Sequence, residues 1–164
     1  MKRIRLALAC AWLTCAAALA YAEPKGADAL RAAASAETLE LARTAARCGD
    51  DVVLGALAAA DDPSLQLAAI RAAPYIVDRH QALLPLAQIA GSRDPELAAR
   101  AAWKALTIAQ ELVREHLEVR EIVPSELAPA KRQLSAVQAD ASARPDIRVY
   151  AGQAAHLLAS LGVP

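Results

Sequence analysis

The sequence predicts an all-α fold built from helix pairs that follow one another along the chain, and three observations support this fold class. Residues 61–112 contain one helical pattern twice, at an offset of 32 residues, and internal repeats of this period are typical of stacked helical units. Each copy begins with an Asp-Pro pair, a common helix start. The chain is 56% hydrophobic but only 3% aromatic and contains no Phe, which favours closely spaced helices packed through Ala, Leu, Ile and Val.

The two copies share one apolar helix face. Residues match in the pairs Pro63 and Pro95, Leu65 and Leu97, Ala69 and Ala101, Ala73 and Ala105, and Ile76 and Ile108. The apolar positions advance by four, four and three residues, so we expect them on one face of one helix in each copy. Asp62 and Asp94 precede the prolines, where a carboxylate can accept a hydrogen bond from the second or third backbone N–H of the helix.

A second helix is expected between the two Asp-Pro pairs. It opens at Arg79-His80-Gln81, and we expect Gly91 to end it in a left-handed conformation. Its predicted apolar face consists of Leu83, Leu84, Leu86, Ala87 and Ile89.

A third copy spans residues 145–161. Its residues Pro145, Ile147, Ala151, Ala155 and Leu158 match Pro95, Leu97, Ala101, Ala105 and Ile108. Arg144 stands where the first two copies have aspartate, so we expect a helix without a carboxylate cap. Asp146 in the first turn still interacts favourably with the positive end of the helix dipole.

The remaining segments are assigned around these copies. Residues 23–60 are predicted to form N-terminal helices and a degenerate first repeat, with one helix ending at Gly49. A terminal repeat is expected to deviate from the pattern, because its outer side meets water. Residues 113–124 are an insertion, which is expected partly to lengthen the helix from Pro95 and partly to form a loop. Residues 125–164 form the C-terminal unit. The insertion is either a binding loop or a long turn with solvated charges.

Helix pairs of about thirty residues, introduced by Asp-Pro and followed by an Ala-rich first helix, resemble the short HEAT-like repeats found in bilin lyases and other α-solenoid proteins. The resemblance covers about residues 50–161. It implies a right-handed α-solenoid of about four helix pairs, an armadillo-type fold. Since stacking of such units leaves a preformed outer surface, we hypothesise a scaffold or adaptor that holds an unknown protein partner on that surface.

Residues 1–22 have the pattern of a cleaved signal peptide. A basic start is followed by an apolar stretch over residues 6–19, and Ala20-Tyr21-Ala22 fits a cleavage site. The apolar stretch is short for a membrane span. We therefore expect an exported bacterial protein, periplasmic or extracellular, with no stable membrane span after cleavage.

Removal of this segment changes the charge balance. It holds three of the 18 Lys and Arg residues and none of the 18 Asp and Glu residues, which leaves 15 basic against 18 acidic residues and a formal charge of −3. Nucleic acid is therefore not an expected partner. Cys48 becomes the sole thiol, either as a buried small apolar residue or as a site that pairs between chains.

No residue pattern for catalysis or cofactor binding is present. His80, His116 and His156 each lack a second His or Cys at metal-ligand spacing, and no nucleophile elbow or Gly-rich phosphate loop occurs. We expect a non-enzymatic protein without cofactor or metal, monomeric or weakly self-associating. The alternatives are a HEAT-like lyase or hydroxylase-type enzyme or enzyme subunit, and a structural envelope protein that self-associates.

Trp103 differs from its equivalents in the other copies, Arg71 and Gln153, which are polar. An indole on a polar stripe is a candidate anchor for a protein partner, although the insertion folding back over it would explain it equally well. Tyr75 and Tyr150 are weaker candidates. The residues predicted to bind the partner are Trp103, His80, Gln81, Arg114, Glu118, Lys131 and Arg132.

Overall fold

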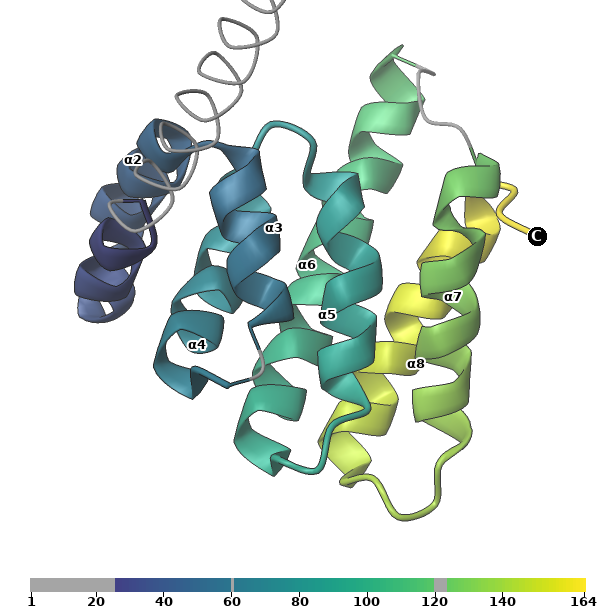
Figure 1. The fold of residues 1–164 in the computed structure, drawn as a ribbon. Helices are drawn as coiled ribbons and strands as arrows, with labels where there is room; N and C mark the ends of the chain where they lie inside the picture. The colour runs from purple at the N-terminus through teal and green to yellow at the C-terminus, as the bar shows by residue number, and fades with distance from the viewer. Residues whose placement is uncertain (1–25, 60, 120–123) are drawn as a thin grey trace, which may run out of the picture.

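The computed structural model describes residues 26–59, 61–119 and 124–164, and all regular structure within these ranges is helical (Figure 1). The helices are α2 (Thr38–Cys48), α3 (Asp50–Ala58), α4 (Pro63–Ala72), α5 (Leu83–Ala90), α6 (Pro95–Val119), α7 (Pro124–Ala139) and α8 (Pro145–Ser160). Short 3-10 helices are η1 (Ala33–Ser35), η2 (Ala73–Tyr75) and η3 (Arg79–Ala82), and residues 26–32 are also helical. The all-α prediction is confirmed for these ranges, whereas the predicted signal peptide lies outside them.

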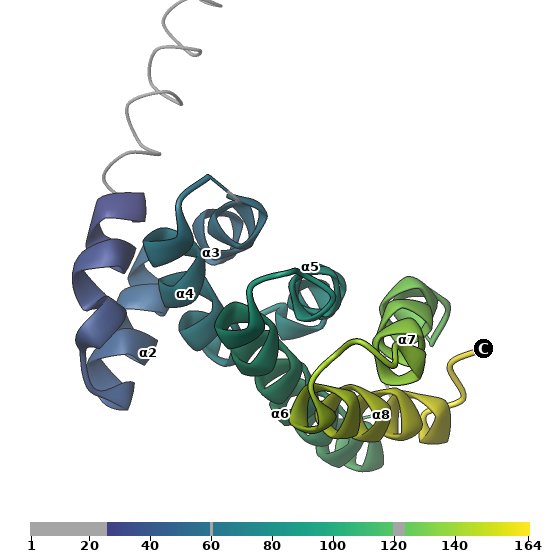
Figure 2. The same ribbon diagram turned by 90° about the horizontal axis from the view of Figure 1, so that it is seen from below.

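The helices form two layers (Figure 2). One layer contains α3, α5 and α7, the other contains α4, α6 and α8, and α2 lies at the N-terminal end of the array. From α3 onward the chain therefore alternates between the layers. Extensive contacts join α3 to α4, α5 to α6 and α7 to α8 across the layers, and α5 to α7 and α6 to α8 within them.

The repeated apolar positions lie in the core between the helices. All twelve are at most 9% exposed: Leu65, Ala69, Ala73, Ile76, Leu97, Ala101, Ala105, Ile108, Ile147, Ala151, Ala155 and Leu158. Burial of each Leu or Ile side chain contributes about 1.5–3 kcal/mol. The alanines contribute less burial energy but let neighbouring helices approach closely, and the predicted burial of all twelve positions is confirmed.

The helix starts also agree with the prediction. Asp62 Oδ1 accepts a hydrogen bond from the Leu65 backbone N–H at 3.0 Å. Asp94 Oδ1 accepts hydrogen bonds from the N–H groups of Glu96 at 2.9 Å and Leu97 at 3.1 Å. Arg144 provides no side-chain cap to α8 and instead forms an ion pair with Asp146 at 2.7 Å.

Two predictions about helix ends are wrong. The helix that begins at Pro63 ends at Ala72, before Ile76, because Pro74 lacks an N–H and its ring clashes with the preceding turn. Gly91 has φ −89° and is not left-handed, because a hydrogen bond from its N–H to the Gln88 carbonyl closes the end of α5 as a tight turn. Gly49, by contrast, has φ +86° and ends α2 as expected.

The second helix of the first strong copy begins later than predicted. Residues Arg79–Ala82 form the 3-10 helix η3, and α5 starts at Leu83. Leu84 is 36% exposed and does not belong to the buried face of α5. An ion pair of 2.8 Å between Arg79 and Glu115 connects η3 to α6.

Candidate functional site

The exposed tryptophan lies on the layer formed by α4, α6 and α8. Trp103 is 49% exposed on α6. Its ring contacts Tyr150 of α8 edge to face, with ring centroids 5.1 Å apart and an interplanar angle of 68°. Such an aromatic pair is worth about 0.5–1.5 kcal/mol beyond its burial. The indole is therefore supported by α8 while about half of its surface stays open in the described part of the chain.

A small cavity of about 210 Å³ borders Trp103, between α2, α4 and α6. We call it the basic cavity, because Arg71, Arg100 and Lys104 line it together with Tyr75 and Trp103. The remaining lining residues are Thr38, Leu41 and Ile70. Three cationic and two aromatic side chains thus share one concave site.

The positive charge of the basic cavity is only partly neutralised. Arg100 forms an exposed ion pair with Glu96 at 2.8 Å. One N–H of Arg71 donates to the Ala36 carbonyl at 2.8 Å, which leaves the charge of the guanidinium without a carboxylate. Neither Arg71 nor Lys104 has a carboxylate within 4.0 Å among the described residues. Burial, and to a smaller extent the nearby charge of Arg71, lowers the pKa of Lys104.

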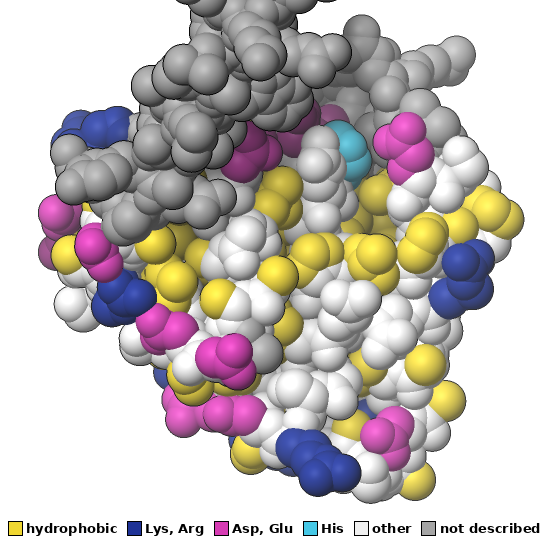
Figure 3. Space-filling view, in the orientation of Figure 1, with side chains coloured by type: hydrophobic (Ala, Val, Ile, Leu, Met, Phe, Trp, Pro, Cys, Tyr) yellow, Lys and Arg dark blue, Asp and Glu magenta, His cyan; other side chains and the backbone are white. Residues whose placement is uncertain are grey.

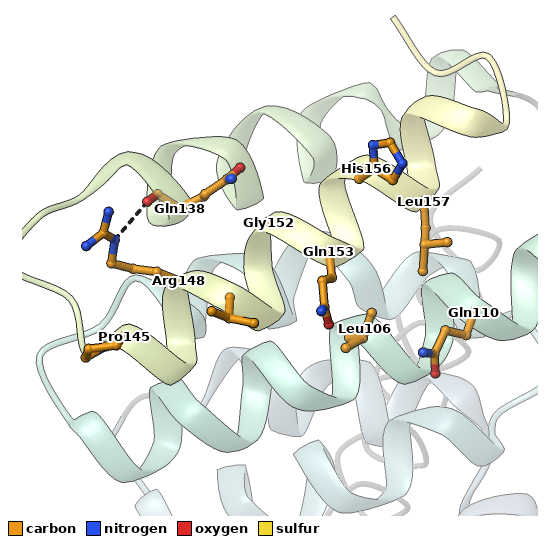
Figure 4. A pocket seen from close by; sticks show the side chains of 10 residues that line it. Leu106, Gln110, Gln138, Pro145, Arg148, Gly152, Gln153, His156 and Leu157 are labelled. Atoms are coloured by element: carbon orange, nitrogen blue, oxygen red, sulfur yellow. Dashed lines mark hydrogen bonds between the residues drawn. The ribbon is translucent and has the colours of Figure 1, made fainter.

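An open groove of about 800 Å³ lies between α6 and α8 (Figure 4). Leu106 and Gln110 line it from α6, and Val149, which is 52% exposed, lines it from α8. Arg148 donates from Nε to the backbone carbonyl of Gln138 at 3.1 Å, which ties α8 to the end of α7.

Trp103 and Leu106 are three residues apart on α6, and Val149 is next to Tyr150 on α8. Both elements that form the Trp103–Tyr150 pair therefore also line the groove, whereas Trp103 itself lines the basic cavity. We call this combination of Trp103, the basic cavity and the groove the Trp103 surface.

The equivalent repeat positions run across this layer. Arg71 on α4 and Trp103 on α6 line the basic cavity, and Gln153 on α8 lines the groove. Equivalent residues of stacked helical units lie side by side, so the alignment of Arg71 with Trp103 already contained the signal for the cavity that they share. The place of Lys104 in the cavity and the contact between Trp103 and Tyr150 were not predicted from the sequence. They depend on the shift between neighbouring helices, which cannot be read from one alignment.

The other predicted binding residues do not join Trp103. Arg114 on α6 pairs with Glu111, and Gln81 within η3 donates to Asp78 at 3.5 Å. On α7, Lys131 donates to the Val163 carbonyl at 2.8 Å. His80 is half-buried and Arg132 is exposed, whereas the side chain of Glu118 lies outside the described residues. The candidates are thus divided between the two layers.

The opposite face presents a mixed surface. Figure 3 shows the face formed by α3, α5 and α7, where apolar side chains run across the middle and charged side chains of both signs lie mainly toward the edges. Val77, 84% exposed, lies just before η3 and donates its backbone N–H to Asp50 at the start of α3. Val77 is therefore a single exposed apolar side chain on a turn.

The described residues contain no group of three or more His, Cys, Asp or Glu side chains placed to hold a metal ion. The Nδ1 atom of His116 is buried without a hydrogen-bond partner within the same part of the chain. Cys48 is half-buried and donates to the Gly26 carbonyl at 3.5 Å, and burial raises the pKa of its thiol. None of the helices over the described ranges combines the length and apolarity needed to cross a membrane.

Comparison with protein-family models, curated proteins and solved structures finds no match to this chain.

Proposed function

We propose that this chain is an exported scaffold of short HEAT-like repeats, arranged as a right-handed α-solenoid, which binds another protein and catalyses no reaction itself. The observation that carries the proposal is Trp103, a half-exposed indole that packs against Tyr150 and lines the basic cavity. Tryptophan is enriched among the few residues that dominate the free energy of protein–protein association.

The alternation of the chain between two layers supports the solenoid part of the proposal. The equivalent apolar faces let the units pack on one another, most extensively where α7 and α8 pack on α5 and α6. Such packing gives a surface that is formed before the partner arrives, which lowers the entropy cost of binding. The export part rests on residues 1–22, whose basic start, apolar stretch and small-residue end follow the signal-peptide pattern.

The geometry of the Trp103 surface favours a protein over a small molecule. The groove is open, whereas small-molecule sites enclose most of their ligand. An aromatic anchor flanked by an open apolar groove and a charged site matches the arrangement of a protein interface, where a few buried anchors are surrounded by polar contacts.

The test is affinity capture from the native envelope fraction, with the wild-type chain and Trp103→Ala side by side. We expect one protein to be recovered in stoichiometric amount with the wild type and lost with the variant, because truncating a hot-spot residue weakens binding about 30-fold or more. Val77→Ala is the matched control, since it removes an exposed apolar side chain that lines neither the basic cavity nor the groove and lies on a turn hydrogen-bonded to Asp50 of α3. Thermal unfolding verifies that each variant folds.

Equal recovery with the wild type and Trp103→Ala would contradict the proposed surface. A purified protein that carries a pigment or a metal would favour the lyase or hydroxylase class instead. A mass of two or more chains without a heterologous partner would favour the self-associating structural protein.

A further inference from the structure

The basic cavity adds chemical detail to the Trp103 surface. Its volume of about 210 Å³ lies below the 300–1,000 Å³ of ordinary small-molecule sites, and it has room for about one side chain. Leu41 and Ile70 provide apolar walls, and Trp103 forms part of the rim. An occupant should therefore have a short apolar stem and a compact polar end.

The positive charge of the basic cavity determines which polar group its occupant should carry. Lys104 has three N–H donors, and Arg71 has five, of which one is given to Ala36. Two neighbouring cations without a carboxylate among the described residues repel each other and lose hydration, which destabilises the free chain. The lowered pKa of Lys104 has the same cause. An incoming anion reduces this repulsion and accepts hydrogen bonds from the N–H groups that are still free.

We propose that the basic cavity binds the carboxylate of one Glu or Asp side chain of the partner protein, whose main contact is Trp103. The inference rests on the proposed function and names the chemistry of the partner at this point of the interface. Arg71 offers two parallel N–H groups to the carboxylate oxygens, and Lys104 offers a point charge. Tyr75 and Trp103 cover the methylene groups of the acidic side chain.

The experiment uses the full chain with Trp12→Phe, in which Trp103 is the sole tryptophan. Its fluorescence is followed while N-acetylglutamate amide is added, with N-acetylglutamine amide as a neutral probe of almost the same shape. We expect the acidic probe to bind about tenfold more tightly or better, because a hydrogen bond to a charged group is stronger than one to a neutral group. The affinity should fall as salt is raised.

Variants of the cavity sharpen the test. Lys104→Gln and Arg71→Gln should each reduce the affinity about tenfold, whereas Lys104→Arg should retain most of it. Arg93→Gln, at an exposed position before α6, changes the net charge equally and should leave the affinity unchanged. Equal binding of the two probes, an equal loss with Arg93→Gln, or tighter binding of inorganic phosphate than of the glutamate probe overturns the inference.

The capture experiment separates this inference from the proposed function. Capture that depends on Trp103 but is unchanged by Lys104→Gln and Arg71→Gln keeps the function and overturns the carboxylate contact. If the glutamate probe binds as expected but no protein is captured, the proposed function fails, and with it the assignment of the carboxylate to a protein partner. Loss of capture with both cavity variants supports both.

Discussion

The helices α4 and α6 start alike but differ in length. Both begin with Asp-Pro and bury the same apolar pattern, yet α4 has 10 residues and α6 has 25. The position of Pro74, just after α4, is occupied in α6 by Leu106. Proline cannot donate the backbone hydrogen bond and clashes with the preceding turn. The comparison shows that apolar spacing decides which side chains are buried, whereas one proline decides where the helix ends.

The shorter helix α4 does not leave its last repeated apolar position exposed. Ile76 lies beyond η2 in extended backbone, with φ −77° and ψ 158°, but is only 2% exposed. Its equivalent Ile108 lies within α6 and is fully buried. The additional length of α6 carries Leu106 and Gln110, which form one wall of the groove beside Trp103. The difference between α4 and α6 is thus one source of the Trp103 surface.

The largest expected effect comes from placing a charge on the shared face. Ile108→Asp should abolish the cooperative thermal transition, since it removes a fully buried side chain and buries an unpaired carboxylate, at a cost of about 5 kcal/mol or more. The measurement is unfolding followed by circular dichroism. Gln110→Asp on the exposed side of α6 is the control and should melt close to the wild type. A normal transition for Ile108→Asp would contradict the assigned core.

The next prediction transfers the proline of the α4 segment to α6. Leu106→Pro should destabilise the protein by about 3 kcal/mol more than Leu106→Ala, because the proline removes one helix hydrogen bond and breaks α6. Leu106→Ala accounts for the lost apolar contacts, as Leu106 is only 4% exposed. Helical circular dichroism and denaturant unfolding measure both effects. Equal stability of the two variants would mean that α6 accommodates a kink without cost.

Most of the helix assignment could be predicted from the sequence, and the reasons are local. Asp62 and Asp94 act as caps within three residues of their own position, and the apolar spacing reflects the helix period. The early end of α4 was also a local signal, since Pro74 was visible, but the regular position of Ile76 outweighed it in the prediction.

The candidate site was less predictable, because it depends on contacts between helices. Trp103 was identified by its difference from Arg71 and Gln153, and the structure places Arg71 with Trp103 at the basic cavity and Gln153 at the groove. Trp103 packs against Tyr150, and Lys104 lines the basic cavity together with Trp103. Both contacts depend on how far α6 is shifted along its neighbouring helices. That shift arises from side-chain packing along the whole interface, which no single motif records.

A smaller effect is expected from giving α8 the start that α4 and α6 possess. The backbone of Arg144 has φ −56° and ψ 145°, an extended geometry that suits a capping residue. Arg144→Asn should therefore raise the free energy of unfolding by about 0.5–1 kcal/mol. The lost ion pair with Asp146 is exposed and offsets little of this gain. Asp94→Ala should lower the free energy of unfolding by a similar amount. Changes of opposite sign for the two variants, measured by denaturant unfolding, would confirm that the helix starts are equivalent.

The smallest effect concerns the pH dependence of the α4 start. Hydrogen bonds from the Leu65 N–H and then from Ser64 and Arg31 hold the pKa of Asp62 well below its usual range. The folded chain therefore binds a proton at Asp62 less readily than the unfolded chain. The resulting stabilisation is complete above about pH 4 and is lost as the pH falls further.

Asp62→Asn retains the capping oxygen but cannot ionise. It should lower the melting temperature by about 2 °C at pH 7, and this difference should shrink steadily below pH 4. Arg31→Gln removes one of the three donors to Asp62 and should give a smaller decrease with the same pH profile. A difference between Asp62→Asn and wild type that stays constant down to pH 2 would show that the charge of Asp62 does not contribute, and that this residue stabilises the start of α4 through the hydrogen bond alone.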